Sequence, residues 1–134
     1  MRQIEFRGLR TDGKGWIYGD LLHNHWTGGD TFTPCAIRYL IGDLYSHPIE
    51  VRPETVGQFT GLHDKSGNKI FEGDVILCVD YGQQVNGVIV ADLVRSGYMV
   101  KWLPKTDFND CIYVRLDSIT IIGNIHEHPE LINK

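Results

Sequence analysis

The stretch that decides the fold reads Asp64-Lys-Ser-Gly-Asn-Lys-Ile-Phe-Glu-Gly-Asp74 and continues directly into Val75-Ile-Leu-Cys-Val79. In its first part an Asp can accept hydrogen bonds from the backbone two residues further on, and Gly67 can adopt the positive φ that closes a tight turn. The sequence therefore predicts a β-hairpin over Gly61 to Asp74. The uncharged apolar run after it predicts a strand.

Apolar runs of strand length continue beyond this hairpin at short intervals. They are Val75 to Val79, Gly87 to Ala91, Tyr98 to Leu103, Ile112 to Leu116 and Ile119 to Ile122. Short, evenly spaced strands with tight turns are typical of a small SH3-like barrel, and an OB-like barrel fits the same spacing. Ala, the best helix former, occurs only twice, so we expect little helix. A short helical turn is expected at Pro129, docked by Leu131 and Ile132.

The part of the chain before this region also has a β pattern. We expect a first hairpin from Ile4 to Leu22, because apolar and polar residues alternate over Ile4 to Arg7, turn residues follow at Thr11 to Gly15, and Trp16 to Leu22 resumes as a strand. His23 to Pro34 is polar and predicts a loop, and further strands are expected at Cys35 to Ile41 and Ile49 to Val51. The fold class is therefore mainly β.

The length of 134 residues predicts a single domain over 1–134. Within it we expect an N-terminal β extension over 1–52, and the turn-rich stretch and barrel over 53–134. No apolar run approaches the roughly 18 residues of a membrane span, and no signal peptide is visible, so a cytoplasmic protein is expected. Cys35, Cys78 and Cys111 are odd in number and widely separated, which predicts reduced and mostly buried thiols.

The charge balance disfavours a nucleic-acid-binding protein without excluding it. The net charge is −4, and neither part of the chain is basic, whereas affinity for phosphate depends mainly on Lys and Arg.

The sequence motifs indicate no catalytic residue. Glu72 and Asp74 could act as an acid and base pair, but such residues more often cap a turn, and no serine or cysteine lies in a nucleophile motif. We therefore expect a protein that is not an enzyme and needs no cofactor.

Two His-x-His pairs are the only candidates for a metal site. In a strand, residues two apart share a face, so His23 with His25, or His126 with His128, could place two imidazoles on one ion. Zinc needs a third or fourth ligand, and nothing in the sequence fixes one. The prediction is that no metal binds and that these histidines lie on the surface.

Four aromatic residues are candidates for a binding surface, because aromatic side chains contribute strongly to interfaces. They are Trp16, Trp26, Tyr98 and Trp102. The alternative is that they pack in the core. Unpaired strand edges of a small β domain also favour association, so a homo-oligomer or a complex with another protein is expected.

Three segments of the chain resemble the signatures of a known family. They are Ile4-Glu-Phe-Arg7, the stretch from Glu54 to Asp74, and Ile122-Gly-Asn-Ile-His-Glu-His-Pro-Glu-Leu131. Together they resemble the YopX family of phage and prophage proteins. The resemblance implies a phage or prophage gene whose product acts in the cytoplasm of the bacterial host, and it names no reaction.

The three segments that resemble the family are rich in Gly, Asp and apolar residues, which are the types that define turns and cores. Those to which we assign a structural role are Gly61, Asp64, Gly67, Ile70, Glu72, Gly73, Asp74, Gly123, Asn124 and Pro129. The function expected from these observations is an accessory protein that acts as a non-enzymatic protein-interaction module. The alternative is a nucleic-acid-associated accessory protein that uses an SH3-like barrel surface.

Overall fold

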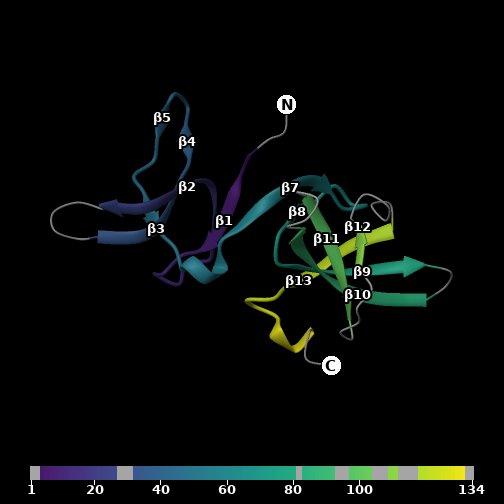
Figure 1. Ribbon diagram of the computed structural model, residues 1–134. Helices are drawn as coiled ribbons and strands as arrows, with labels where there is room; N and C mark the ends of the chain where they lie inside the picture. The colour runs from purple at the N-terminus through teal and green to yellow at the C-terminus, as the bar shows by residue number, and fades with distance from the viewer. Residues whose placement is uncertain are drawn as a thin grey trace. The chain divides into compact units, whose positions relative to one another are not determined.

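The computed structural model describes residues 4–26, 32–80, 83–92, 97–103, 109–111 and 118–131. The chain divides into two compact units, residues 1–59 and 60–134 (Figure 1). The regular elements of the described residues are antiparallel β-strands and short 3₁₀ turns, among them Pro53–Thr55 and Pro129–Leu131. The predicted mainly β fold with little helix is confirmed, as is the short helical turn at Pro129.

The first unit is one antiparallel sheet and a small hairpin beside it. Its strands are β1 (Phe6–Leu9), β2 (Trp16–Trp26), β3 (Phe32–Arg38), β6 (Ile49–Glu50) and the beginning of β7 (Gly57–His63), in the order β6-β3-β2-β1-β7. Leu9 lies opposite Trp16 across the first turn, so the predicted first hairpin is confirmed. The sheet packs its apolar face on a core of Ile17, Cys35, Ile37 and Val51.

The loop predicted over His23 to Pro34 is wrong. β2 runs on to Trp26, β3 begins at Phe32, and the two strands pair from Trp26 with Phe32 to Asp20 with Arg38. A polar composition favoured a loop, but a strand ladder is made by backbone N–H and C=O groups, and composition does not reveal whether a partner strand lies alongside. The prediction for residues 27–31 lies outside the described residues.

A two-stranded hairpin follows β3. The predicted strand Cys35 to Ile41 ends at Arg38, and β4 (Leu40–Ile41) then pairs with β5 (Leu44–Tyr45) around a turn in which Gly42 has a φ of 62°. Figure 1 shows this hairpin projecting beyond the strands β2 and β3. The chain then returns through β6, which confirms the predicted strand near Ile49.

In the second unit the described residues form the end of β7 and six further strands. β7 pairs with β8 (Lys69–Phe71), and Gly67 in the turn between them has a φ of 88°, so the predicted hairpin is confirmed. The remaining strands are β9 (Asp74–Asp80), β10 (Gln83–Asp92), β11 (Gly97–Leu103), β12 (Asn109–Cys111) and β13 (Ile119–Asn124), in the order β12-β11-β10-β9-β13. Their core is Ile70, Ile76, Cys78, Ile89, Val100 and Ile119.

The SH3-like barrel is the part of the fold prediction that is not confirmed. Four of the predicted apolar runs match β9, β10, β11 and β13, and the fifth, Ile112 to Leu116, lies outside the described residues. In the ranges that the structure describes, β12 and β13 are the two ends of an open sheet rather than neighbours. Spacing along the chain sets the number of strands, but closure depends on stagger and tilt, which spacing does not encode.

Candidate functional site

The hairpin β4–β5 exposes an unusual number of large apolar side chains. The exposed fractions are 40% for Tyr39, 60% for Leu40 and for Ile41, 75% for Leu44 and 47% for Tyr45. Leu40 lies opposite Tyr45, and Ile41 lies opposite Leu44. Because successive strand residues point to opposite faces, one pair is presented on each face of the hairpin. Both faces are therefore apolar, whereas a hairpin that stays in water needs at least one polar face.

The base of this hairpin is closed by a set of hydrogen bonds around a buried serine. The backbone N–H of Ser46 donates to the carbonyl of Tyr39 over 2.7 Å, and the N–H of Tyr39 donates to Ser46 Oγ over 3.0 Å. The Ser46 hydroxyl in turn donates to the carbonyl of His47 over 3.0 Å. An isolated two-stranded hairpin is marginally stable in water. These bonds hold its base, so the apolar side chains are presented on a positioned element.

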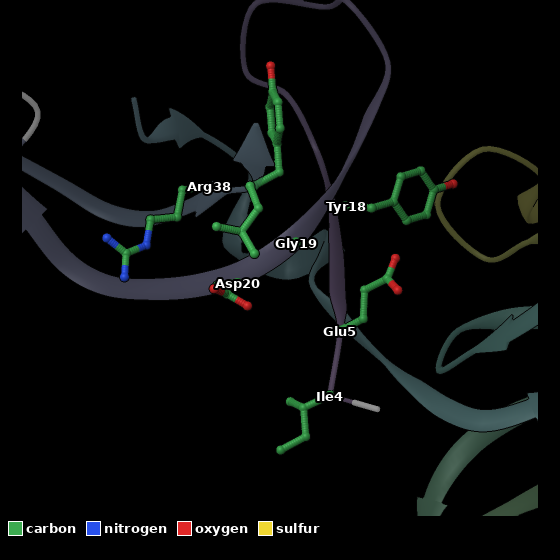
Figure 2. Close-up of a pocket in the computed structure, with 8 residues that line it drawn as sticks. Ile4, Glu5, Tyr18, Gly19, Asp20 and Arg38 are labelled. Atoms are coloured by element: carbon green, nitrogen blue, oxygen red, sulfur yellow. The ribbon is translucent and has the colours of Figure 1, made fainter. Parts of the chain in front are cut away.

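A hollow of about 250 Å³ lies beside the hairpin (Figure 2). Its lining combines exposed apolar side chains with three charged ones, and consists of Ile4, Glu5, Tyr18, Gly19, Asp20, Arg38, Tyr39 and Leu40. In the view of Figure 2, Glu5 and Tyr18 project on one side of Gly19 and Arg38 on the other. A Cβ atom at Gly19 would collide with the backbone carbonyl of Arg38, so only glycine allows β2 and β3 to approach so closely here.

Arg38 connects the hollow to the hairpin. Its guanidinium carbon lies 3.9 Å from the centroid of the Tyr45 ring, which is a cation–π contact. Its Nε atom is buried and has no hydrogen-bond acceptor within the described part of the chain. Asp20 is its neighbour across the β2–β3 ladder. Arg38, whose Nε has no acceptor within the described part of the chain, therefore lies beside the exposed apolar side chains of the hairpin β4–β5.

The four aromatic residues predicted to bind belong to different units, Trp16 and Trp26 to the first and Tyr98 and Trp102 to the second. Trp16 is half-buried in the first unit, where the guanidinium of Arg7 lies 4.6 Å from its ring centroid. Tyr98 and Trp102 belong to the second unit, and both pack against its apolar core. Trp26 ends β2, and its side chain lies outside the described residues. For Tyr98 and Trp102 these contacts favour the alternative of core packing.

Sequence reasoning missed the residues that do form an exposed cluster. The pattern Leu40-Ile-Gly-Asp-Leu-Tyr45 contains a turn between two apolar pairs, which is a hairpin signal. It does not say whether the apolar pairs face a core or water. That difference depends on what packs against the hairpin, which is a property of the tertiary structure.

Asp64 has a structural role in the second unit. It is 5% exposed, and its Oδ1 accepts the backbone N–H groups of Ser66 and Asn68, each over 2.9 Å. Its Oδ2 accepts the N–H of Ile121 from β13 over 3.2 Å. Burial by itself raises the pKa of Asp64, but the hydrogen bonds from Asn68, Ile121 and Ser66 outweigh it and hold the pKa below its ordinary value. The carboxylate thus ties the β7–β8 turn to a distant strand.

The Glu72-Gly73-Asp74 segment forms the turn from β8 to β9. Asp74 is 1% exposed, and its Oδ2 accepts the backbone N–H of Phe71 over 2.7 Å. Gly73 has a φ of 92°, and its N–H donates to the carbonyl of Ile89 over 2.8 Å. Asp74 therefore caps this turn from a buried position.

The C-terminal segment is organised around Asn124, which is 7% exposed. Its Oδ1 accepts the N–H groups of His126 and Glu127 over 3.0 and 2.9 Å, and its own N–H donates to His128 Nδ1 over 3.2 Å. A Cβ atom at Gly123 would lie 2.8 Å from the same Nδ1, so glycine is needed for the close contact. His128 is therefore a half-buried packing residue rather than a surface histidine, because the turn folds it back onto β13.

The described residues contain neither a cluster of metal ligands nor a helix that could span a membrane. No group of three or more His, Cys, Asp or Glu side chains there is arranged to hold a metal ion, and the side chains of His23 and His25 lie outside the description. No helix in the same ranges is long and apolar enough to cross a membrane. Cys35 and Cys78 are buried free thiols, and burial raises the pKa of Cys35. The side chain of Cys111 is not described.

Comparison with known proteins places the chain in a family. No curated protein matches it at a significant level. The fold is similar to that in the crystal structure of protein EF1440 from Enterococcus faecalis, with a TM-score of 0.54 and 24% sequence identity over 99% of this chain and 100% of that one. At this identity the likeness shows the fold alone. The family model described as YopX protein matches residues 5–133, nearly the whole chain. The chain therefore belongs to the YopX family.

Proposed function

We propose that this protein is a non-enzymatic protein-interaction module whose contact surface is the hairpin β4–β5. The single observation that carries the proposal is the exposure of Leu40, Ile41 and Leu44, which are 60%, 60% and 75% exposed at the end of a positioned hairpin. Soluble proteins rarely leave such side chains together in water unless a partner covers them. Burying one of them in an interface contributes on the order of 1 to 2 kcal/mol.

The charges around the hairpin support a protein partner over a nucleic acid. Glu5 and Asp20 line the hollow beside it, and the chain carries a net charge of −4. Carboxylates at a contact surface repel a phosphate backbone, whereas a protein interface accommodates apolar side chains with a few charged ones at the rim. The resemblance to phage and prophage proteins supports an accessory role in the cytoplasm of a bacterial host.

Site-specific photo-crosslinking in living bacteria tests this proposal. A photo-reactive amino acid is placed at Leu44 in one variant, and in the matched control it replaces Lys14, which is exposed in the turn between β1 and β2. We expect defined protein adducts from position 44 and none from position 14. Adding Ile41→Gln, which changes the neighbour of Leu44 on the same face of the hairpin, should abolish the adducts without lowering the melting temperature. Equal labelling from both positions, or labelling unaffected by Ile41→Gln, would refute the proposal.

A further inference from the structure

We infer that the partner of this protein supplies an extended segment, which adds as a strand to the edge of β2 over residues 20–26 and places a basic side chain beside Asp20. This inference rests on the proposed function of a protein-interaction module and specifies the chemistry of its partner. It follows from three features of the first unit: an open strand edge, an acidic hollow at the start of that edge, and an apolar side chain along it.

The strand β2 changes its neighbour halfway along its length. It pairs with β1 from Trp16 to Gly19 and with β3 from Asp20 to Trp26. On the side of β1, the second half of β2 therefore has no strand beside it in the described part of the chain, and Figure 1 shows the paired ends of β2 and β3 extending beyond β1. Lys and Pro, which proteins use to block an exposed edge, do not occur in residues 20–26.

The direction of the backbone groups along the β2 edge follows from the ladder with β3. The N–H of Val51 donates to the carbonyl of Cys35 over 3.2 Å, so Cys35 turns its backbone groups toward the side of β6. His23 lies opposite Cys35 and therefore turns its own N–H and C=O away from β3. Because this direction alternates along a strand, Leu21 and His25 do the same. These three residues offer donors and acceptors to an added strand, which is a known mode of peptide recognition.

The outer edge of β13 in the second unit is closed, in contrast to the β2 edge. The carbonyl of Ile119 accepts the N–H of Lys65 over 3.1 Å, and the N–H of Ile121 donates to Asp64 over 3.2 Å. The β7–β8 turn thus occupies the edge of β13, whereas no described turn occupies the β2 edge.

The hollow at the start of the β2 edge has an acidic wall. Asp20 is exposed, and its carboxylate makes no ion pair or hydrogen bond with the described residues. Arg38 lies opposite Asp20 across the ladder, but its guanidinium lies over the Tyr45 ring, 3.9 Å from the centroid. Glu5 adds a second carboxylate to the lining, and Leu40 adds an apolar surface. Such a hollow suits a Lys or Arg side chain, whose aliphatic stem packs on apolar surface while its charged group meets a carboxylate.

Leu21 determines which side chain is favoured next along the added strand. Leu21 and Phe6 both pack against the apolar core of the first unit. A residue that lies opposite Leu21 on an added strand shares its face, so an apolar side chain there extends this core. The partner segment is therefore extended, with a basic residue at the end that meets the hollow and an apolar residue opposite Leu21.

Selection from a library of random peptides of about ten residues, enough to span the β2 edge, tests strand addition to the purified full-length chain. We expect binders enriched in Lys or Arg close to an apolar β-branched residue. For a selected peptide, Asp20→Lys should weaken binding on the order of 10-fold by charge reversal. The matched control is Asp12→Lys, which changes an exposed carboxylate in the turn between β1 and β2 and should leave the Kd unchanged.

The backbone pairing is tested at His23. His23→Pro removes an N–H that points away from β3 and should weaken peptide binding on the order of 10-fold, whereas His23→Ala keeps this N–H and should weaken it less. Should His23→Pro lower the melting temperature, N-methylated peptides replace it. Successive N–H groups of a strand point to opposite edges, so N-methylation of one alternate set of residues should abolish binding and that of the other set should leave it intact. No binders, binders without a basic residue, or equal tolerance of both methylated sets overturns strand addition.

Strand addition and the interaction module fail in different ways. Adducts at position 44 that are lost with Ile41→Gln but persist with Asp20→Lys and with His23→Pro overturn strand addition and leave the module. Absence of specific adducts at position 44, together with peptide binding that Asp20→Lys and His23→Pro weaken, overturns the hairpin as the contact surface and leaves strand addition. Adducts lost with Ile41→Gln and also with Asp20→Lys support both.

Discussion

Replacing the buried Asp64 should reveal how much of the second unit depends on one carboxylate. The informative change is Asp64→Asn, which keeps the size and one acceptor oxygen of the side chain but removes its charge. In the folded protein Oδ1 serves the two amides of the β7–β8 turn and Oδ2 serves Ile121. An asparagine can satisfy one of these positions only, and its NH₂ group then faces an N–H donor at the other.

The magnitude follows from these contacts. Hydrogen bonds to a charged group contribute about 1.5 to 3 kcal/mol each. Asp64→Asn loses the hydrogen bond from Ile121, and its remaining hydrogen bonds are weaker because their acceptor is no longer charged. This variant should lower the free energy of unfolding by about 2 kcal/mol. Asp64→Ala removes every hydrogen bond that the carboxylate accepts. Ser66 and Asn68 are exposed, however, so water can replace the carboxylate as the acceptor for their backbone N–H groups. We therefore expect about 3 kcal/mol for alanine, well below the sum of the four hydrogen bonds that the carboxylate accepts.

Urea unfolding at pH 7 measures these differences, and Lys65→Ala is the control. Lys65 is exposed and makes its one described bond through its backbone, to the carbonyl of Ile119, so its replacement should change the free energy of unfolding by less than about 0.5 kcal/mol. An effect of Asp64→Asn as small as that of the control would refute the reasoning.

The same variant has a defined pH dependence. Hydrogen bonds hold the pKa of folded Asp64 below its ordinary value of 3.8. A carboxyl group with a lowered pKa stabilises the fold fully above the ordinary value and loses this contribution as the pH falls through the folded pKa. The difference in unfolding free energy between the unmodified chain and Asp64→Asn should therefore be constant near neutral pH and shrink below about pH 4. A difference that grows on acidification contradicts the assigned hydrogen bonds.

Three further predictions concern individual positions. Gly19→Ala should lower the free energy of unfolding by about 2 kcal/mol or more in thermal unfolding, because the new Cβ would meet the carbonyl of Arg38. Gly67→Ala should cost only about 1 kcal/mol in the same assay, because nothing lies within 4 Å of its Cβ position and the cost comes from the positive φ alone. Cys35 and Cys78 should react with a thiol reagent far more slowly in the folded protein than in urea, because both are buried and burial raises the pKa of Cys35; rapid native labelling would contradict this.

The local features of this fold could be predicted from the sequence. The turn at Gly67, the hairpin around it and the strands β9, β10 and β11 follow from turn residues and from apolar runs of strand length. These signals work because φ preferences and side-chain alternation act within a few residues. The same reasoning identified Asp74 as a turn cap, since its partner, the N–H of Phe71, lies three residues away.

The features that needed the tertiary structure depend on partners far along the chain. The extension of β2 and β3 through a polar segment depends on the hydrogen bonds that each strand makes with the other. The hydrogen bond from the N–H of Ile121 to Asp64 joins residues that are 57 positions apart in the sequence. The apolar hairpin is the strongest case. The pattern from Leu40 to Tyr45 predicts strands. Ile37 is buried and Leu44 is exposed because other parts of the fold pack against the first and not against the second. The residues next to them in the sequence do not determine that difference.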